Sequence, residues 1–349
     1  MVAGVPGARD RIVVVLAFNE SYLAPASTVI RSCLLQHEGE ELRFEVIHDE
    51  SLSSPDLKML EEMCRVGGAE INFHLMDEGR LQGLPVIDRF GLIVWSRLFL
   101  PDLLQDTPRA LYLDCDVLVL SSLRPLWQED LGTSPLGAVA NVVEPAARDH
   151  IARMGVSYPG GFFNSGVILF QLDRMREEHS TAELVNFAVQ NGRKLVWPDQ
   201  DALNVVFSGR WHSLHPRWNA QNSLWSWRDW AIDVFGASTV DEAVSDPAIR
   251  HFEGPSVAKP WHYLCPAPHR DAYRETLALT PWADEPLQDR TVSTMVVALL
   301  PGSWRLGVYR RLVETRSSIR SLVERKCTDD SAFGRACIRF SASRRKTKR

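Results

Sequence analysis

Two aspartates separated by one residue lie inside an apolar run, and their type and spacing suggest chemistry. Asp114 and Asp116 stand within Ala110-Leu111-Tyr112-Leu113-Asp114-Cys115-Asp116-Val117-Leu118-Val119-Leu120. Side chains at i and i+2 of an extended chain point to the same face, so the two carboxylates can converge. Carboxylates that close repel each other unless a cation lies between them, and a hard divalent ion suits such a pair. We therefore predict a divalent metal site; a solvated turn at the end of a strand is the alternative.

The elements around these aspartates predict an α/β fold. The apolar run 110–120 is typical of a strand buried on both faces. Strands that alternate with helices at this spacing indicate βαβ units and a mostly parallel sheet, with ligands bound beyond the carboxyl ends of the strands. The further expected strands are 12–18, 43–48, 71–75, 136–142 and the apolar part of 160–170. The expected helices are 25–36, 53–65, 89–104, 174–190, one that opens near Trp197, and one near 271–279.

Three other polar segments offer groups that could serve the same site. Segment 160–170 brackets Asn164 with glycines, which allow close backbone approach, although a tight turn before a core strand is an equal alternative. Asp199 begins a helix, where it is either a capping or a reactive carboxylate. The third segment carries His251, Gly254 and Lys259. Imidazole binds metals and lysine binds phosphate, whereas a lone histidine is usually structural.

Five tryptophans lie close together between residues 211 and 230. They are Trp211, Trp218, Trp225, Trp227 and Trp230. Indole rings stack on the C–H faces of sugars but also fill cores, so both interpretations stay open. Sugar contact is favoured for Trp225 and Trp227, which are expected in a polar loop.

Composition and missing motifs exclude several protein classes. The chain has 349 residues and six cysteines without a C-x-x-C pair, which fits a reducing cytosol. No apolar run reaches the length of a membrane-spanning helix, and no signal peptide is expected. The first strand is not followed by G-x-G-x-x-G, and neither a G-K-[ST] P-loop nor a G-x-S-x-G elbow is present. Dinucleotide oxidoreductases, P-loop enzymes and α/β hydrolases are therefore disfavoured.

The charge is divided unevenly along the chain. Residues 301–349 hold 14 Lys/Arg and 4 Asp/Glu, a formal charge of +10, while the whole chain is −5. An acidic body with a basic tail suggests an anionic partner for the tail, and a merely solvated tail is the alternative. Apolar residues interleave with the arginines, so the segment could lie on an anionic leaflet. We expect a membrane surface and no nucleic acid as the partner.

The ordered motifs together resemble glycosyltransferase family 8, which includes bacterial lipopolysaccharide galactosyl- and glucosyltransferases and glycogenin. The resemblance runs from about Ile12 to Trp261 and rests on Leu-Tyr-Leu-Asp-Cys-Asp-Val, Phe-Phe-Asn-Ser-Gly-Val, Asp-Gln-Asp and His-Phe-Glu-Gly. It implies a GT-A fold, a UDP-sugar donor, Mn²⁺ (with Mg²⁺ as a second candidate) and retention of the anomeric configuration. The basic tail also resembles the membrane-associating tail of the bacterial members.

The resemblance assigns roles to individual residues. Asp114, Asp116 and His251 would bind the metal, while Ala17, Asn19 and Tyr22 would hold uracil and ribose. Arg97 would lie near the donor and the first metal aspartate, Asn164 would contact the donor sugar, and Asp199 and Gln200 would lie beside the reacting sugar. Gly254 and Lys259 would clamp the diphosphate. The sequence departs from the family pattern at Asn19, where aspartate is more usual, and by two extra residues before Lys259.

We therefore predict a catalytic domain over residues 1–285 and a basic amphipathic tail over 286–349. The predicted activity is retaining transfer of galactose or glucose from a UDP-sugar to a saccharide or glycolipid acceptor such as a lipopolysaccharide core. The predicted location is cytoplasmic, peripheral to the inner face of the cell membrane. A nucleotide-sugar hydrolase and a catalytically silent sugar- or membrane-binding protein remain the alternatives.

Overall fold

The computed structural model describes residues 11–37, 42–86 and 93–327. These residues form two compact units, one of residues up to 261 together with 265–286, the other of 262–264 together with the chain from 287 onward. The first part of the expected helix 89–104 and the last part of the expected tail lie outside the described residues.

A seven-stranded mixed sheet is the centre of the first unit. Its order is β3-β2-β1-β4-β7-β6-β8. The strands are β1 (Ile12–Phe18), β2 (Leu42–His48), β3 (Glu70–Leu75), β4 (Arg109–Leu113), β6 (Leu136–Ala140), β7 (Phe163–Gln171) and β8 (His212–Ser213). The pairs on either side of β1 are parallel, as the sequence predicts, whereas β7 is antiparallel to both β4 and β6.

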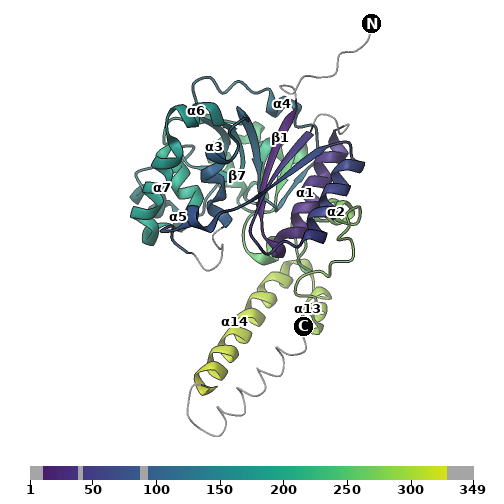
Figure 1. The fold of residues 1–349 in the computed structure, drawn as a ribbon. Coiled ribbons are helices and arrows are strands. Elements are labelled where there is room, and N and C mark those ends of the chain that lie inside the picture. Colours follow the sequence, from purple (N-terminus) through teal and green to yellow (C-terminus); the bar gives the residue numbers. More distant parts are fainter. Residues whose placement is uncertain (1–10, 38–41, 87–92, 328–349) are drawn as a thin grey trace. The chain divides into compact units, whose positions relative to one another are not determined.

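Helices cover both faces of this sheet. The helices described in this unit are α1 (Leu23–Gln36), α2 (Ser54–Val66), α3 (Leu100–Leu103), α4 (Arg124–Trp127), α5 (Pro145–Arg153), α6 (Leu172–Glu177), α7 (Ser180–Asn191), α8 (Pro198–Val206), α9 (Ser223–Ser226), α10 (Arg228–Phe235), α11 (Ala237–Ser245) and α12 (Arg270–Leu277). Figure 1 shows α1 and α2 on one side of the sheet and α3, α5, α6 and α7 on the other. Alternate residues of β1 accordingly enter different cores: Val14 packs in the cluster that contains α1, and Val15 in the cluster that contains Trp95.

The expected single strand 110–120 is wrong, because the chain leaves the sheet at the aspartates. β4 ends at Leu113, Asp114–Asp116 form a turn, and β5 (Val117–Val119) begins a second sheet. That sheet has the order β5-β10-β9, with β9 (Ala220–Gln221) and β10 (Ile249–His251). The apolar residues on both sides of the turn are buried, so the run looked continuous although it serves two sheets.

Two expected helices are also interrupted. The expected helix 174–190 is two helices, α6 and α7, separated at His179, whose φ of 54° lies in the left-handed region. The described part of the expected helix 89–104 is a 3-10 helix at Ile93–Phe99 followed by the short α3. In contrast, α2 begins as expected, with Ser53 and Asp56 forming a capping box and proline in the first turn.

The described part of the second unit forms two helices, α13 (Val292–Ala298) and α14 (Gly302–Cys327). Within this unit His262 bonds the hydroxyl of Tyr309 at 3.1 Å, and Tyr263 N–H donates to Gln288 O at 2.9 Å. Among the described residues no helix has the length and apolarity needed to cross a membrane.

Candidate active site

The turn between the two sheets places Asp114 and Asp116 between β7 and β10. Asp114 N–H donates to Gly166 O on β7 at 2.8 Å, and Phe252 N–H, just after β10, donates to Asp116 O at 2.9 Å. Each aspartate is therefore fixed to a different sheet through its backbone. The carboxylates converge as the sequence predicts, but across a turn rather than along one strand.

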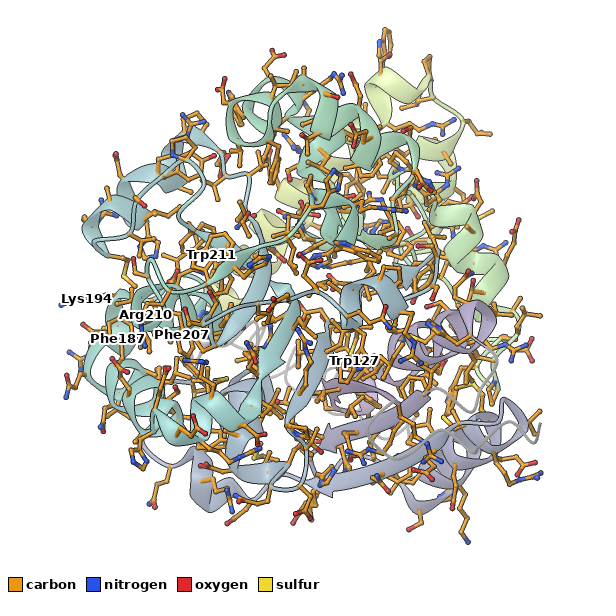
Figure 2. The ribbon with its side chains drawn as sticks, turned by 90° about the horizontal axis from the view of Figure 1, so that it is seen from above. Trp127, Phe187, Lys194, Phe207, Arg210 and Trp211 are labelled. Carbon is orange, nitrogen blue, oxygen red and sulfur yellow. The ribbon has the colours of Figure 1, made fainter. Side chains whose placement is uncertain are left out.

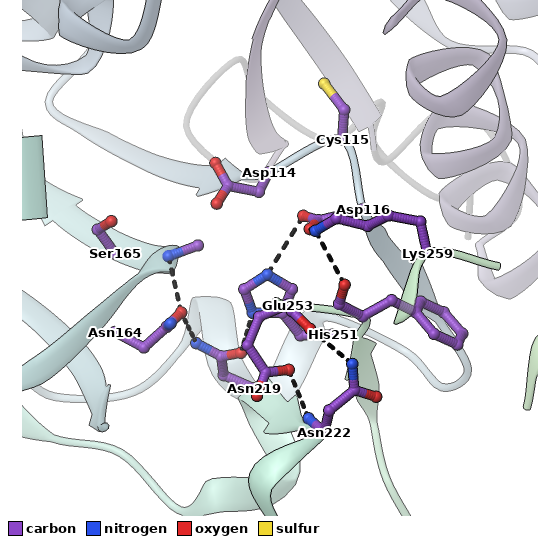
Figure 3. Close-up of polar contacts among 12 residues, drawn as sticks. Asp114, Cys115, Asp116, Asn164, Ser165, Asn219, Asn222, His251, Glu253 and Lys259 are labelled. Carbon is purple, nitrogen blue, oxygen red and sulfur yellow. Dashed lines mark hydrogen bonds and ion pairs between the residues drawn. The ribbon is translucent and has the colours of Figure 1, made fainter. Parts of the chain in front are cut away.

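Asp114, Asp116 and His251 form a cluster with ligand atoms within 4.8 Å of one another. Figure 3 shows the imidazole facing Asp116, with Asp114 beside them. His251 Nε2 lies 3.2 Å from Asp116 Oδ1, and the Lys259 ammonium contacts Asp116 Oδ2. Burial alone would raise the pKa of Asp116, but Lys259 and His251 outweigh it and hold this pKa well below its ordinary value. Two carboxylates and one imidazole are a donor set that fits a divalent cation such as Mn²⁺.

Arg97 joins the cluster to a second buried carboxylate. Its guanidinium lies 2.7 Å from Asp114 Oδ1 and 3.0 Å from Asp199 Oδ2, and it also donates to Ser165 O at 2.8 Å. Burial would lower the pKa of Arg97, whereas Asp114 and Asp199 raise it, so the guanidinium stays charged. The ring of Tyr112 lies 4.2 Å from the guanidinium carbon and completes the support.

Asp199 and Gln200 both face segment 160–170. Ser165 donates its hydroxyl to Asp199 Oδ2 at 3.1 Å and its backbone N–H to Gln200 Oε1 at 3.0 Å. Burial raises the pKa of Asp199, with Arg97 acting against it. The capping alternative for Asp199 is wrong, because Trp197 is the N-cap and Asp199 lies inside the first turn of α8; Asp201 accepts from Val196 N–H and Trp197 N–H. Asp199 is thus an inward-facing carboxylate bound by Arg97.

Asn164 is buried, and hydrogen bonds connect it to His251 through Asn219. Its Oδ1 accepts from Gly166 N–H and from Asn219 Nδ2, both at 2.9 Å. Asn219 in turn bonds His251 Nδ1 at 2.8 Å. Asn219 has no signal of its own in the sequence, where it follows Trp218 in an aromatic segment.

Two glycines have geometric reasons to be glycine. A Cβ on Gly166 would meet Asp114 Oδ2 at 2.8 Å and collide with His251 Cε1, so its absence lets the cluster lie directly on β7. Gly254 has a φ of 105°, which side chains rarely adopt. Segment 160–170 was expected to approach a ligand; the structure shows that Gly166 makes room for the ligating side chains themselves.

The segment between Gly254 and Lys259, which is two residues longer than the family pattern, contains a short 3-10 helix at Ser256–Ala258. Lys259 N–H donates to Ser256 O at 3.0 Å, and its ammonium returns to the site, donating to Phe252 O at 3.0 Å. Glu253 fixes the same loop from the other side, because its carboxylate accepts from Asn222 N–H and, at 3.1 Å, from Ser223 N–H. The insertion therefore does not remove Lys259 from the site.

The predicted nucleotide contacts lie at the carboxyl end of β1. Ala17 O accepts weakly from the Cys115 thiol at 3.7 Å, which places it beside the turn of the aspartates. Asn19 Oδ1 accepts from the Ser21 hydroxyl at 2.6 Å. Tyr22 is 43% exposed and meets the Trp261 ring edge-on at 6.1 Å. An exposed aromatic ring at the end of a parallel strand is placed where a base could stack.

Most of the tryptophans pack against other side chains, and the polar loop expected at Trp225 and Trp227 is wrong, because α9 and α10 occupy this segment. Trp225 lies in α9, where its ring packs 4.3 Å from the guanidinium carbon of buried Arg250. Trp211 packs against Phe163 at 5.2 Å; Figure 2 shows it near Phe207 and Arg210. Trp227 keeps 37% of its surface exposed beside Trp230, so it is the better placed of the two favoured rings for sugar contact.

Comparisons with known proteins agree with this geometry. Residues 13–265 match the family model described as glycosyl transferase family 8. General stress protein A of Bacillus subtilis (strain 168) is 30% identical over 280 residues, covering 78% of this chain and 96% of that protein. Lipopolysaccharide 1,3-galactosyltransferase of Salmonella typhimurium is 25% identical over 282 residues, covering 78% and 80%.

A solved structure gives the same result for the fold. The galactosyltransferase LgtC, crystallised with donor and acceptor sugar analogs, aligns with a TM-score of 0.67 at 25% identity, covering 84% of this chain and 99% of that chain. The span matched by the family model contains the predicted site residues from Ala17 to Lys259. This chain is therefore a glycosyltransferase with the GT-A fold, and it belongs to glycosyltransferase family 8.

Proposed function

We propose that this chain transfers a hexose from a UDP-sugar to a saccharide or glycolipid acceptor, with Mn²⁺ and with retention of the anomeric configuration. The observation that carries the proposal is the convergence of Asp114, Asp116 and His251 within 4.8 Å, beside Lys259 and Arg97. Uracil and ribose would lie at Ala17, Asn19 and Tyr22, and the diphosphate would extend toward Gly254 and Lys259.

Asp114, Asp116 and His251 would hold the metal, which when bound supplies a Lewis acid for the departing diphosphate. Lys259 adds a second positive charge from the loop after β10, and Gly254 permits the turn that carries this loop. Charge fixed in advance where negative charge develops lowers the barrier without reorganisation. Arg97 holds Asp114 and Asp199 in place rather than pointing freely at solvent, since both of its carboxylate contacts are at 3.0 Å or less.

The surroundings of Asp199 and Gln200 favour same-face attack over a covalent intermediate. Gln200 is neutral, and its Oε1 already accepts from Ser165 N–H at 3.0 Å. Asp199 is bound by Arg97 and Ser165, so a nucleophilic role would require it to give up both contacts. We assign Gln200 to stabilise the sugar in its transition state and Asp199 to orient the groups around it.

A screen of UDP-sugars with Mn²⁺ tests the proposal. Slow UDP release should identify one preferred hexose, an added acceptor should increase that release, and the product should keep the donor's anomeric configuration by NMR. Asp116→Asn serves as the inactive control. Release that ignores acceptors would indicate a hydrolase, and no release from any UDP-sugar would indicate a silent binding protein. The names of the lipopolysaccharide transferases among the relatives make core oligosaccharides the first acceptors to try.

We further propose that the tail attaches the enzyme to the inner face of the cell membrane. In the second unit Val292 and Val296 on α13 and Leu299, the residue that follows α13, are exposed at one-turn spacing, and Trp304 is 65% exposed on α14. Fourteen Lys/Arg lie within residues 301–349. Each basic residue near an anionic surface contributes about 1 kcal/mol, reduced by salt.

Co-sedimentation with phosphatidylglycerol vesicles tests this attachment. The full chain should bind at low salt and be released at high salt, while a chain ending at residue 289 should stay in the supernatant and retain UDP release. Trp304→Ser should weaken binding without changing its salt dependence. Salt-insensitive binding, or none by the full chain, would contradict an electrostatic anchor.

A further inference from the structure

The side-chain amides of Asn164 and Asn219 can adopt one orientation each, and a backbone group decides it. Gly166 N–H donates to Asn164 at 2.9 Å, and an N–H needs an acceptor, so Asn164 must present Oδ1 there. The same oxygen lies 2.9 Å from the Asn219 side chain. Asn219 must therefore turn its Nδ2 toward Asn164.

This orientation fixes the face that Asn219 shows to His251. With Nδ2 directed at Asn164, Asn219 offers Oδ1 to the imidazole, 2.8 Å from Nδ1. An oxygen acceptor requires that Nδ1 carry a hydrogen. Asn219 is fully buried and Asn164 and His251 nearly so, so water cannot readily supply an alternative partner. Figure 3 shows the chain of contacts from β7 through both amides to the ring.

We propose that Asn164 and Asn219 are positioning residues that hold His251 as the Nδ1–H tautomer and so direct the Nε2 lone pair toward the metal cluster. The inference rests on the proposed metal role of His251. The orientation of the His251 ring agrees with this role, since Nε2 is the ring nitrogen that faces the cluster, 3.2 Å from Asp116 Oδ1. A histidine ligand commonly needs such a fixed partner on its second nitrogen to present the first.

The hydrogen-bond chain from Gly166 N–H through Asn164 and Asn219 to His251, called the relay below, also limits which atom of Asn164 can contact a sugar. Its Oδ1 already accepts from Gly166 N–H and Asn219 Nδ2, so its Nδ2 is the end that remains to donate to a donor hydroxyl. Asn164 therefore has two separable roles, one through each atom of its amide. Aspartate at this position keeps the acceptor and removes the donor, which gives a variant that separates them.

Mn²⁺ binding, followed by the loss of the free-ion EPR signal, tests the relay with four variants of the full chain. Asn219→Leu removes the acceptor and should weaken Mn²⁺ binding about 10- to 100-fold. Asn219→Asp loses the donor toward Asn164 but keeps the acceptor toward Nδ1, so it should weaken Mn²⁺ binding less than Asn219→Leu does. Asn164→Asp should bind Mn²⁺ normally but lose sugar transfer. Asn191→Leu on α7, whose amide donates to Phe187 O, is the matched control.

A second readout locates the proton directly. In ¹⁵N-histidine-labelled protein with Zn²⁺, long-range ¹H–¹⁵N spectra should show His251 with protonated Nδ1 and metal-bound Nε2, with His251→Gln assigning the signals. This pattern should persist in Asn219→Asp and be lost in Asn219→Leu. A folded Asn219→Leu variant with wild-type affinity and an unchanged spectrum would overturn the relay, as would equal weakening by both Asn219 variants.

The two proposals fail in distinguishable ways. If the wild type binds neither Mn²⁺ nor Zn²⁺, the metal role in the proposed function is wrong. The metal-free ring spectrum at alkaline pH then decides the relay alone, because a neutral His251 with its proton on Nε2 would overturn it.

Discussion

Replacing Arg97 by methionine should destabilise the metal-free protein, because two carboxylates lose their shared cation. The Arg97 and Asp199 side chains are only 6% and 7% exposed, while Asp114 is 27% exposed. Removing one partner of a buried ion pair costs about 3–5 kcal/mol, and the partial exposure of Asp114 favours the lower end. A loss of about 3 kcal/mol should lower the melting temperature by on the order of 10 °C.

The stability lost in Arg97→Met should depend on pH, and the direction of that dependence follows from the pKa of Asp199. Burial already raises the pKa of Asp199 against the pull of Arg97, so removing that charge raises this pKa further. When the pKa of a carboxyl is higher in the folded protein than its unfolded value of about 3.9, the protein loses stability as the pH rises from the unfolded to the folded pKa. The deficit of Arg97→Met relative to the wild type should therefore be largest at pH 8 and shrink toward pH 5.

Thermal unfolding followed by circular dichroism in EDTA, at pH 8 and pH 5, measures this deficit. Arg65→Met is the matched control, because Arg65 pairs with Glu62 on the surface of α2 and its loss should leave the melting temperature unchanged. Equal melting temperatures for Arg97→Met and the wild type at pH 8, or a deficit that grows on acidification, would refute the reasoning.

Three further substitutions test the site. Asp116→Asn should abolish Mn²⁺-dependent binding of UDP-sugar in calorimetry while the fold persists; near-normal turnover with Mn²⁺ would exclude Asp116 as a ligand. Gln200→Ala should slow transfer with little change in UDP affinity, and the opposite result in steady-state kinetics would remove Gln200 from the reacting centre. Gly166→Ala should cost about 1–3 kcal/mol and disrupt Mn²⁺ binding, because its methyl group would meet Asp114 and His251. Gly307→Ala in α14, where a Cβ meets nothing within 4 Å, should leave Mn²⁺ binding unchanged and should not lower stability.

The sequence predicted the parts of the fold that obey simple periodicity. Apolar runs or alternating apolar and polar residues predicted β1, β2 and β3, and the capping residues predicted the start of α2. The break at Asp114–Asp116 could not be predicted, since burial keeps both flanks apolar although they join different sheets. The break at His179 depends on a left-handed backbone conformation, which the presence of a histidine does not predict.

The sequence predicted the site residues that carry charged or metal-binding groups. It did not predict the residues that only hold those groups in place. Carboxylates, imidazole and lysine in recognisable motifs pointed to the cluster. Asn219 gave no periodic or compositional signal, and its role depends on contacts between segments far apart in the chain. The repulsion expected between Asp114 and Asp116 is also offset within the protein, by Arg97 on one and Lys259 on the other.

The passage of the chain from one sheet to the other at Asp114–Asp116 has a mechanical consequence. Asp114 is attached to the seven-stranded sheet, His251 ends a strand of the three-stranded sheet, and Asp116 lies on the turn that joins them. A cation bound by these three side chains would act as a cross-link between the two sheets. The smaller sheet could then detach only after releasing the ion, so metal concentration would set its resistance to local opening by mass action. Amide hydrogen exchange in β10 should slow with added Mn²⁺ more than exchange in β2, which has no such tie.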